Sequence, residues 1–336
     1  MECFRPAGRR AWNGRRGVAH IRRVGVAEFG SCSVSLEVPG YTVLERVGTG
    51  ARSSIWQVAD VRTGETYVLK RVTRRLTDDD RYLEQAQTEF SISVRFEHPN
   101  LRRSFELRRV RRLFQVRELH LLMEYVPGKT LEQLGPKGVH GTLAIFLKVA
   151  EGLDALHQLG YVHADIKPNN IIVGENGQVK IIDFGQSCPI GHVKERIQGT
   201  PDYIAPEQVR RLPLDQRTDV FNFGATLYWI LTGKAYPTIL PSRKRRDGID
   251  LVASREALPP HEINENVPLA LSRLVMDCCE SNVKDRPANM REVIRRLEVV
   301  QHIMERSNVT VSGGPPRGKK KRGGPASPVF WTDTCA

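Results

Sequence analysis

The spacing of apolar residues changes once along this 336-residue chain, and that change constrains the fold more than any other feature. Between residues 41 and 125, apolar and polar residues alternate in short runs, such as Tyr41 to Val47, with turn residues between the runs. A period of two is typical of strands that bury one face. From Leu143 onward, apolar residues recur every three or four positions, which is typical of amphipathic helices. The sequence therefore predicts an α+β protein with a small β-rich part followed by a larger, mostly helical part.

The predicted elements follow from these two periods. Strands are expected at residues 41–47, 54–59, 66–72, 103–109, 118–125 and 179–182. Helices are expected at residues 78–96, 143–159, 218–232, 266–280 and 290–305. The run Asp78 to Asp80 offers N-cap side chains for the first helix.

The positive charge of the chain is concentrated outside this patterned region. Lys and Arg number 51 against 38 Asp and Glu, a formal charge of +13, but residues 1–40 and 307–336 each contribute +4 of it. Residues 312–328 are mostly Gly, Pro, Ser and basic residues, a composition that buries too little apolar area to fold. We therefore expect a basic disordered extension at 1–40, one folded domain at 41–305 and a disordered tail at 306–336. Nucleic acid is not an expected partner, because the folded part is close to charge balance.

Cysteine usage and hydropathy predict the compartment. The six cysteines show no metal-ligand spacing and are too few for a disulfide scaffold at this length. The best apolar run, Gly224 to Leu231, is far shorter than the ~18 residues that a membrane span needs. The first 23 residues carry seven Arg without the apolar core of an export signal. We expect a cytoplasmic protein with reduced thiols and neither a membrane anchor nor an extracellular sensor module.

Two motifs in the β-rich part suggest phosphate binding. The turn Gly48-Thr-Gly50 connects two predicted strands, a context that favours a flap over phosphates rather than a dinucleotide fingerprint, although such a turn alone is often only a turn. Glycine lets backbone N–H groups approach phosphate oxygens closely. Lys70 ends the third predicted strand, and a buried ammonium needs a carboxylate partner, for which Glu84 and Glu89 are the candidates.

The octapeptide from His163 to Asn170 is the most specific string in the chain. An aspartate such as Asp165 can accept a hydroxyl proton, and an asparagine five residues later can reach a metal ion. Lys167, two residues after Asp165, can offset charge on a transferring phosphoryl group. Asp183-Phe-Gly follows Asp165 by eighteen residues.

Taken in order, these motifs resemble the signature set of the eukaryotic-like protein kinases, in particular the soluble Ser/Thr kinases of bacterial type. The resemblance covers about residues 41–305 and implies a two-lobed fold, with a small lobe at 41–126 and a large lobe at 127–305. It also implies transfer of the γ-phosphoryl group of ATP, with Mg²⁺, to Ser or Thr hydroxyls of protein substrates, including the chain itself. The oligomeric state is not predicted.

The resemblance assigns a role to each motif residue. Asp165 becomes the catalytic base, with Lys167 beside it, and Lys70 the ligand of the α- and β-phosphates. Glu89 becomes the partner of Lys70, because it precedes His98-Pro-Asn100 by nine residues, while Glu84 stays an alternative. Asn170 and Asp183 become the metal ligands. The nucleotide-binding positions are Val47, Gly48, Gly50, Ser53, Ile55, Val68, Lys70, Met123, Glu124, Val126 and Ile172, with the backbone of Glu124 and Val126 facing adenine.

The resemblance also covers three residues with structural roles, and the sequence differs from the kinase pattern at two positions. Glu207 is expected to pair with Arg286, and Asp219 to brace the catalytic loop. Ser53 replaces the third glycine of the flap. Ala164 replaces an arginine that binds a loop phosphate in many kinases, which predicts that activation does not strictly require loop phosphorylation. Between Asp183 and Pro201 the only hydroxyl side chains are Ser187 and Thr200, which agrees with that prediction.

Two other functions and one charge cluster stay open. A pseudokinase would normally lack Lys70, Asp165 or Asp183, and a small-molecule kinase would lack Lys167-Pro168; all are present here. Seven arginines between Arg102 and Arg117 either dock an acidic substrate or nucleic acid, or form a charged sheet edge that resists aggregation.

Overall fold

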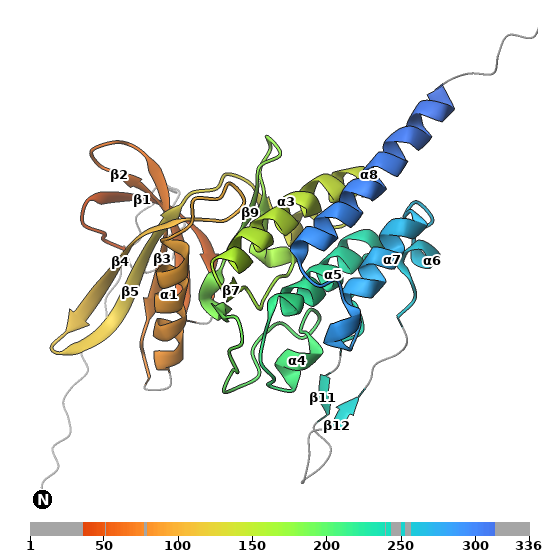
Figure 1. Cartoon of the computed structure of the whole chain (residues 1–336). Helices are drawn as coiled ribbons and strands as arrows, with labels where there is room; N and C mark the ends of the chain where they lie inside the picture. Colours follow the sequence, from red (N-terminus) through yellow and green to blue (C-terminus); the bar gives the residue numbers. More distant parts are fainter. Residues whose placement is uncertain are drawn as a thin grey trace, which may run out of the picture. The chain divides into compact units, whose positions relative to one another are not determined.

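A five-stranded antiparallel sheet forms the small lobe of this computed structural model, which describes residues 36–50, 52–76, 79–238, 240–242, 250–252 and 257–312. The strands are β1 (Tyr41–Thr49), β2 (Ser53–Asp60), β3 (Thr66–Thr73), β4 (Ser104–Arg112) and β5 (Gln115–Glu124). Their spatial order is β1-β2-β3-β5-β4, so β4 is an edge strand (Figure 1). Helix α1 (Asp80–Ser93) contacts β3, β4 and β5. All five predicted strands are present, and Val38, placed by sequence in the N-terminal extension, is buried and bridged to Tyr41.

Helix α1 is shorter than predicted at both ends, and at its N-terminal end the candidate capping side chain is used elsewhere. Asp79 occupies the N-cap position but makes no capping hydrogen bond. Its carboxylate instead accepts hydrogen bonds from the backbone N–H groups of Arg75 and Leu76, and from Arg52 at 2.7 Å. The Arg52 guanidinium is the main cause of the lowering of the pKa of Asp79 to about 2. Arg52 thereby ties the glycine turn to the start of α1; Asp78 lies outside the described residues.

The large lobe is mainly helical. Its helices are α2 (Leu131–Leu134), α3 (Val139–Gln158), α4 (Pro206–Val209), α5 (Gln216–Thr232), α6 (Pro260–Ile263), α7 (Leu269–Cys278) and α8 (Met290–Ser312). Its short strands are β6 (Lys129–Thr130), β7 (Tyr161–Val162), β8 (Ile171–Val173), β9 (Val179–Ile181), β10 (Cys188–Pro189), β11 (Leu240–Ser242) and β12 (Asp250–Val252). Three single 3₁₀ turns are η2 (Pro168–Asn170), η3 (Phe184–Gln186) and η4 (Val283–Asp285). The predicted α+β class is confirmed.

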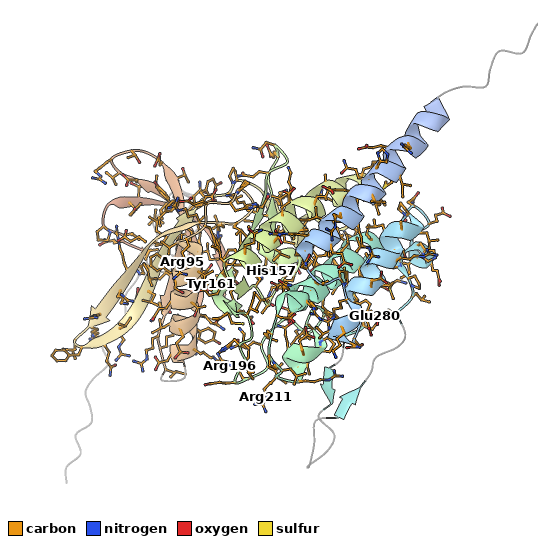
Figure 2. The ribbon with its side chains drawn as sticks, viewed as in Figure 1. Arg95, His157, Tyr161, Arg196, Arg211 and Glu280 are labelled. Carbon is orange, nitrogen blue, oxygen red and sulfur yellow. The ribbon has the colours of Figure 1, made fainter. Side chains whose placement is uncertain are left out.

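Strand β9 links the two lobes. Leu101 forms a parallel bridge with Ile181, and the Ile181 N–H donates to the Asn100 carbonyl at 2.8 Å. A second link lies nearby, where the Arg95 guanidinium donates to the Tyr161 hydroxyl at 3.4 Å (Figure 2). The residues that follow β9, including Asp183, are therefore positioned against the small lobe.

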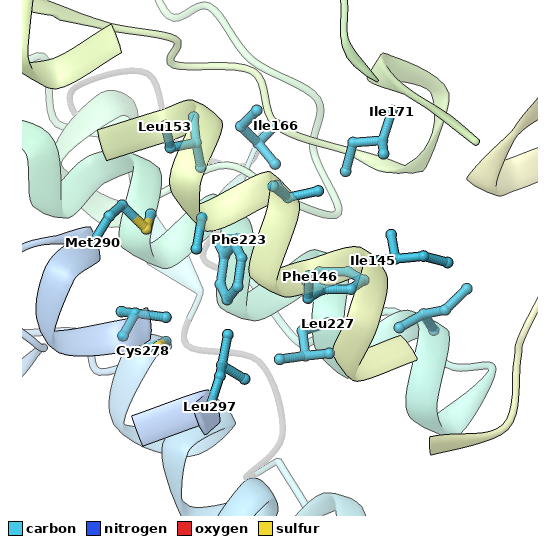
Figure 3. Close-up of a cluster of buried hydrophobic side chains, with 14 of the residues drawn as sticks. Ile145, Phe146, Leu153, Ile166, Ile171, Phe223, Leu227, Cys278, Met290 and Leu297 are labelled. Atoms are coloured by element: carbon cyan, nitrogen blue, oxygen red, sulfur yellow. The ribbon is translucent and has the colours of Figure 1, made fainter. Parts of the chain in front are cut away.

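The main hydrophobic core lies between α3, α5, α7 and α8 (Figure 3). Phe146 of α3 and Phe223 of α5 meet edge to face with ring centroids 5.2 Å apart, and both are fully buried. Leu153, Leu274 and Leu297 are fully buried in the same cluster. Burying each such side chain contributes about 1.5–3 kcal/mol, which makes this core the platform for the loops above it.

The structure bears on two predictions, the disordered ends of the chain and the compartment of the protein. Helix α8 ends at Ser312, so residues 306–312 of the predicted tail are helical, whereas residues 1–35 and 313–336 lie outside the described residues. Among the helices that the structure describes, none combines the length and apolar character needed to cross a bilayer. Cys188, Cys278 and Cys279 are buried free thiols, and burial raises the pKa of Cys188 to about 11.

Candidate active site

The register of the sheet places the nucleotide-binding candidates in one row. Gly48 pairs with Ile55, Ile55 with Lys70, and Lys70 with Leu121, so these positions lie side by side across four strands. Residues directly opposite each other in antiparallel strands point to the same face. One face of the sheet therefore carries the turn, the lysine and an apolar floor.

The apolar floor is built from Val68 and Met123, which pair with each other between β3 and β5 and pack against Leu121 and Ile55. Met123 is buried, whereas Val47 is 48% exposed beside the glycine turn. Ile172, in β8, is half-buried, and Val126 is buried just after β5.

The glycine turn has more room at Gly48 than at Gly50. A Cβ on Gly48 would make only ordinary contact with Ile55, at 3.6 Å. A Cβ on Gly50 would come within 2.6 Å of the Ser53 hydroxyl oxygen. Because the Ser53 hydroxyl can turn away, this contact alone does not require glycine at 50, whereas the glycine at 48 leaves open backbone that a phosphate can approach.

Lys70 joins the two lobes through two carboxylates. Its Nζ lies 2.7 Å from Oε2 of Glu89 on α1 and 3.0 Å from Oδ1 of Asp183. Burial disfavours the charge on Lys70, but Asp183 and Glu89 outweigh it and raise the pKa of the lysine. Lys70 in turn holds the pKa of Asp183 well below its usual range. Glu89 is buried and Glu84 is exposed, so the structure brings Glu89, and not Glu84, to the lysine.

Arg102 belongs to this site and not to a surface cluster. Sequence reasoning grouped it with six other arginines up to Arg117, but its side chain is only 7% exposed. Its Nη2 lies 3.5 Å from Glu89 Oε1, a buried oxygen without a hydrogen-bond partner among the described residues. Arg102 therefore supplies a second positive charge beside Glu89. No spacing in the sequence separates it from its exposed neighbours.

We expect Glu89→Gln to lower the rate of phosphoryl transfer by about 10- to 100-fold, the usual effect of losing a group that orients a ligand-binding residue. The amide keeps the size of the side chain but loses the charge that pairs with Lys70. Steady-state kinetics with a peptide substrate would measure the change. The matched control is Glu84→Gln, an exposed carboxylate on the same helix, which should leave the rate unchanged. Equal losses in both variants would contradict the assignment.

A second cluster surrounds the carboxylate of Asp165 in the large lobe. Oδ2 accepts from Lys167 Nζ at 2.8 Å and from Asn170 Nδ2 at 3.3 Å. Oδ1 accepts from the Thr200 hydroxyl at 2.9 Å, and Gln186 Nε2 lies 3.4 Å from Oδ2. Sequence reasoning did not place Thr200 or Gln186 at this carboxylate. Both oxygens of the Asp165 carboxylate are thus held in place by donors from the same loop and from the segment after Asp183.

Asp219 holds the catalytic loop in a strained conformation. Its two oxygens accept from the backbone N–H groups of His163 at 2.7 Å and Ala164 at 2.8 Å, as the sequence predicts for a brace. Ala164 has φ +60°, a conformation that costs about 1 kcal/mol or more for a residue with a Cβ. Burial opposes the charge of Asp219, but the hydrogen bond from His157 of α3 (Figure 2), the charges of His157 and His163 and the His163 backbone N–H together outweigh burial and lower the pKa of Asp219.

Asp183 and Asn170 offer oxygen atoms suited to a hard cation. The Asp183 side chain is 44% exposed, and its backbone has φ 64°. The Asn170 amide nitrogen donates to the Asp165 carbonyl at 2.8 Å, which leaves its Oδ1 available. Carboxylate and amide oxygens are ligands that Mg²⁺ prefers, and Mg²⁺ usually takes its other ligands from water and phosphates. These two residues therefore fit the metal role that sequence resemblance implies.

Phe184 anchors the segment after Asp183. Its ring is buried, 4.6 Å from the Phe96 ring and 5.1 Å from the His163 ring between centroids. The turn η3 that it begins contacts α1. Phe184 therefore holds this segment against the first helix and beside His163.

Lys180 is a further site residue that sequence reasoning missed. It is buried in β9, where its Nζ lies 2.7 Å from Glu124 Oε1 and donates to the Leu101 carbonyl at 3.3 Å. The Glu124 N–H donates to the Arg103 carbonyl at 2.9 Å. These bonds fix Glu124, whose backbone is expected to face adenine, to both lobes.

A sheet that presents a lysine–glutamate pair, set against a helical lobe that presents an Asp-Lys-Asn cluster, defines the class of two-lobed, kinase-like folds. The family model for the protein kinase domain matches residues 41–302. The chain belongs to this family, whose members generally use ATP and a divalent metal ion.

Three curated relatives illustrate the similarity. A probable serine/threonine-protein kinase of Clostridium acetobutylicum is 26% identical over 275 residues, covering 78% of this chain and 40% of the relative. Serine/threonine-protein kinase PknL of Mycobacterium tuberculosis is 32% identical over 201 residues, covering 57% of this chain and 49% of PknL. Serine/threonine-protein kinase pkn3 of Myxococcus xanthus is 28% identical over 280 residues, covering 77% of this chain and 50% of the relative. The matched region thus spans between two fifths and half of each relative.

Proposed function

We propose that this chain is a serine/threonine protein kinase that transfers the γ-phosphoryl group of ATP to hydroxyls of protein substrates and of itself. The observation that carries the proposal is the position of Lys70, with its ammonium between the carboxylates of Glu89 and Asp183. A degraded pseudoenzyme would have no need to keep this arrangement together with Asp165 and Asn170.

In the proposed mechanism, the chain's own residues orient the reactants and offset charge. Asp165 accepts the proton of the substrate hydroxyl, and Lys167, 2.8 Å from its Oδ2, offsets negative charge on the phosphoryl group. Lys70, oriented by Glu89, binds the α- and β-phosphates. Asp183 and Asn170 would hold Mg²⁺, which supplies charge neutralisation of the phosphates when bound. The turn at Gly48 covers the phosphates and excludes water.

Two finer properties belong to the same proposal. The Asp165-x-Lys167-Pro-x-Asn170 pattern supports specificity for Ser and Thr over Tyr, since the resemblance that it carries is to Ser/Thr kinases. The cytoplasmic location stays a prediction, supported by the free thiols of Cys188, Cys278 and Cys279.

Incubation of the purified chain with labelled Mg²⁺-ATP, followed by phosphoamino-acid analysis, tests the function. We expect phosphoserine and phosphothreonine on the chain and on a general acceptor protein. Nucleotide binding without transfer would identify a pseudokinase instead, and label on small molecules alone would identify the other alternative.

We also propose that the kinase is active without phosphorylation of the segment between Asp183 and Pro201. Ser187 is buried, with its hydroxyl 3.5 Å from the His163 carbonyl. The Thr200 hydroxyl is held by Lys167 and Asp165, at 2.8 and 2.9 Å. Both hydroxyls are therefore engaged inside the site, and Ala164 provides no side-chain charge for a loop phosphate.

Phosphatase treatment should consequently leave most of the activity in place, within about twofold. Mass spectrometry of the treated protein would verify that no phosphate remains on the segment. Loss of nearly all activity, with recovery after rephosphorylation, would contradict this prediction.

A further inference from the structure

The hairpin of β4 and β5 ends in a two-residue tip, Leu113 and Phe114, that the proposed function does not use. Arg112 pairs with Gln115, so only these two residues connect the strands. Leu113 is 90% exposed and Phe114 is 98% exposed, and the hairpin extends beyond the other strands of the sheet (Figure 1). Two large apolar side chains thus stand in solvent at the most exposed point of the lobe's edge.

The conformation of the tip does not favour these residues either. Leu113 has φ 56°. A two-residue hairpin turn with positive φ at its first central position prefers glycine there, because a Cβ crowds the backbone. Leucine at this position strains the turn and exposes apolar surface. Local stability therefore explains neither the leucine nor its neighbour.

The tip is surrounded by positive charge that nothing in the described part of the chain neutralises. Four exposed arginines near the tip make no ion pair with any residue that the structure describes: Arg109, Arg111, Arg112 and Arg117. Two acidic side chains on the same two strands are already engaged. Glu106 pairs with Arg108 at 2.7 Å, and Glu118 pairs with Arg71 at 2.5 Å.

We propose that this tip, together with the four arginines around it, docks the small lobe on a membrane surface rich in anionic lipids. Leu113 and Phe114 enter the boundary between headgroups and acyl chains, and the guanidinium groups bind lipid phosphates and carboxylates. A bilayer has anionic headgroups at its surface and hydrocarbon beneath them. The two apolar side chains at the end of the hairpin would reach the hydrocarbon, while the four arginines behind them stay at the headgroups.

A lipid surface suits this shape better than a macromolecule of fixed form. A stable protein interface buries about 800 Å² and about 20–30 residues on each partner, far more than the two apolar residues and four arginines here. Nucleic acid would bind the arginines and stack a base on Phe114, but it would leave Leu113 exposed. A bilayer deforms around a convex tip and therefore needs no shaped pocket.

Vesicle co-sedimentation of the whole 336-residue chain tests the proposal, with phosphatidylcholine vesicles that contain about 30% phosphatidylserine or none. We expect binding to the anionic vesicles only. Leu113→Ser with Phe114→Ser should weaken binding at least about tenfold. Arg111→Gln with Arg112→Gln should weaken it about 25-fold at low salt, at about fivefold for each charge.

The matched control lies on the turn between β2 and β3. Val61 is 67% exposed and the Arg62 side chain is 88% exposed, so Val61→Ser with Arg62→Gln removes one apolar side chain and one charge from another exposed turn. This control should bind anionic vesicles within about twofold of the unmodified chain. Thermal unfolding of every variant checks the fold without reference to kinase activity.

Insertion has a direct readout in Phe114→Trp, whose fluorescence brominated acyl chains should quench. Equal binding by the Leu113→Ser, Phe114→Ser variant would overturn the proposal, because the chain's net charge alone would then explain the attraction. Absence of vesicle binding, or binding of single-stranded RNA or an acidic protein in its place, would overturn it as well.

Discussion

Replacing Asp165 by Asn should lower kcat for phosphoryl transfer by about 10²- to 10⁴-fold, the range that a positioned general base contributes. The amide has nearly the shape of the carboxylate, so Lys167, Asn170 and Thr200 keep a partner of similar size at the same place. What changes is the loss of negative charge and of one acceptor oxygen. The substituted side chain can orient a hydroxyl but cannot take its proton.

Nucleotide affinity should stay within about twofold in the same variant, because the contacts assigned to ATP lie around Lys70 and the sheet and not at Asp165. Single-turnover kinetics with saturating ATP would separate transfer from binding, and a fluorescent nucleotide titration would give the affinity. Asp154→Asn is the matched control, since Asp154 on α3 contacts Gln158 and Arg291 far from the reacting groups. Unchanged transfer in Asp165→Asn would show that another group accepts the proton.

The residues of the catalytic loop could be read from the sequence because their geometry is local. Asp165, Lys167 and Asn170 lie within six residues, and one loop conformation brings their polar atoms together. The sequence favours Glu89 over Glu84 less clearly. The two glutamates are five positions apart on one helix and therefore point to different faces, so only one of them can reach Lys70. The structure separates them by burial, which a single sequence shows only indirectly.

Arg102 and Lys180 could not be assigned from the sequence, because their partners are distant along the chain. Lys180 meets Glu124 across 56 residues, and its pairing depends on how β9 lies beside the end of β5. Arg102 looks identical in type to the exposed arginines that follow it. Only the bridge between Leu101 and Ile181, which buries this stretch, distinguishes it from them.

The length of the β4–β5 hairpin was missed for a different reason. Turn prediction relies on residues such as Gly, Asn and Asp, and the turn here is Leu113-Phe114. The sequence therefore predicts that the first strand ends at residue 109 and the second begins at residue 118, and it assigns no structure to the residues between them. Leucine and phenylalanine in a tight turn go against turn preferences and bury no apolar surface in return. Such a position is where a binding role is worth testing.

Replacing Arg286 by Ala should destabilise the large lobe by about 3–5 kcal/mol, the usual cost of leaving one member of a buried ion pair without its partner. Arg286 Nη1 and Nη2 lie 2.8 and 2.9 Å from the two oxygens of Glu207, and the arginine side chain has no exposed surface. Its Nε also donates to the Glu280 carbonyl at 2.7 Å (Figure 2). Its removal would leave the Glu207 carboxylate and this carbonyl buried without those donors.

Urea unfolding followed by circular dichroism would measure the loss, and two further variants make it specific. Arg296→Ala breaks a half-exposed pair with Asp277, whose side chains are 34% and 45% exposed, and should cost less than about 1 kcal/mol. Arg286→Met combined with Glu207→Gln should recover part of the lost stability, since no unpaired charge then stays buried. If Arg286→Ala were no more destabilising than Arg296→Ala, the pair would not hold the segment after Pro201 to the helical lobe, and the position of Thr200 beside Asp165 would need another support.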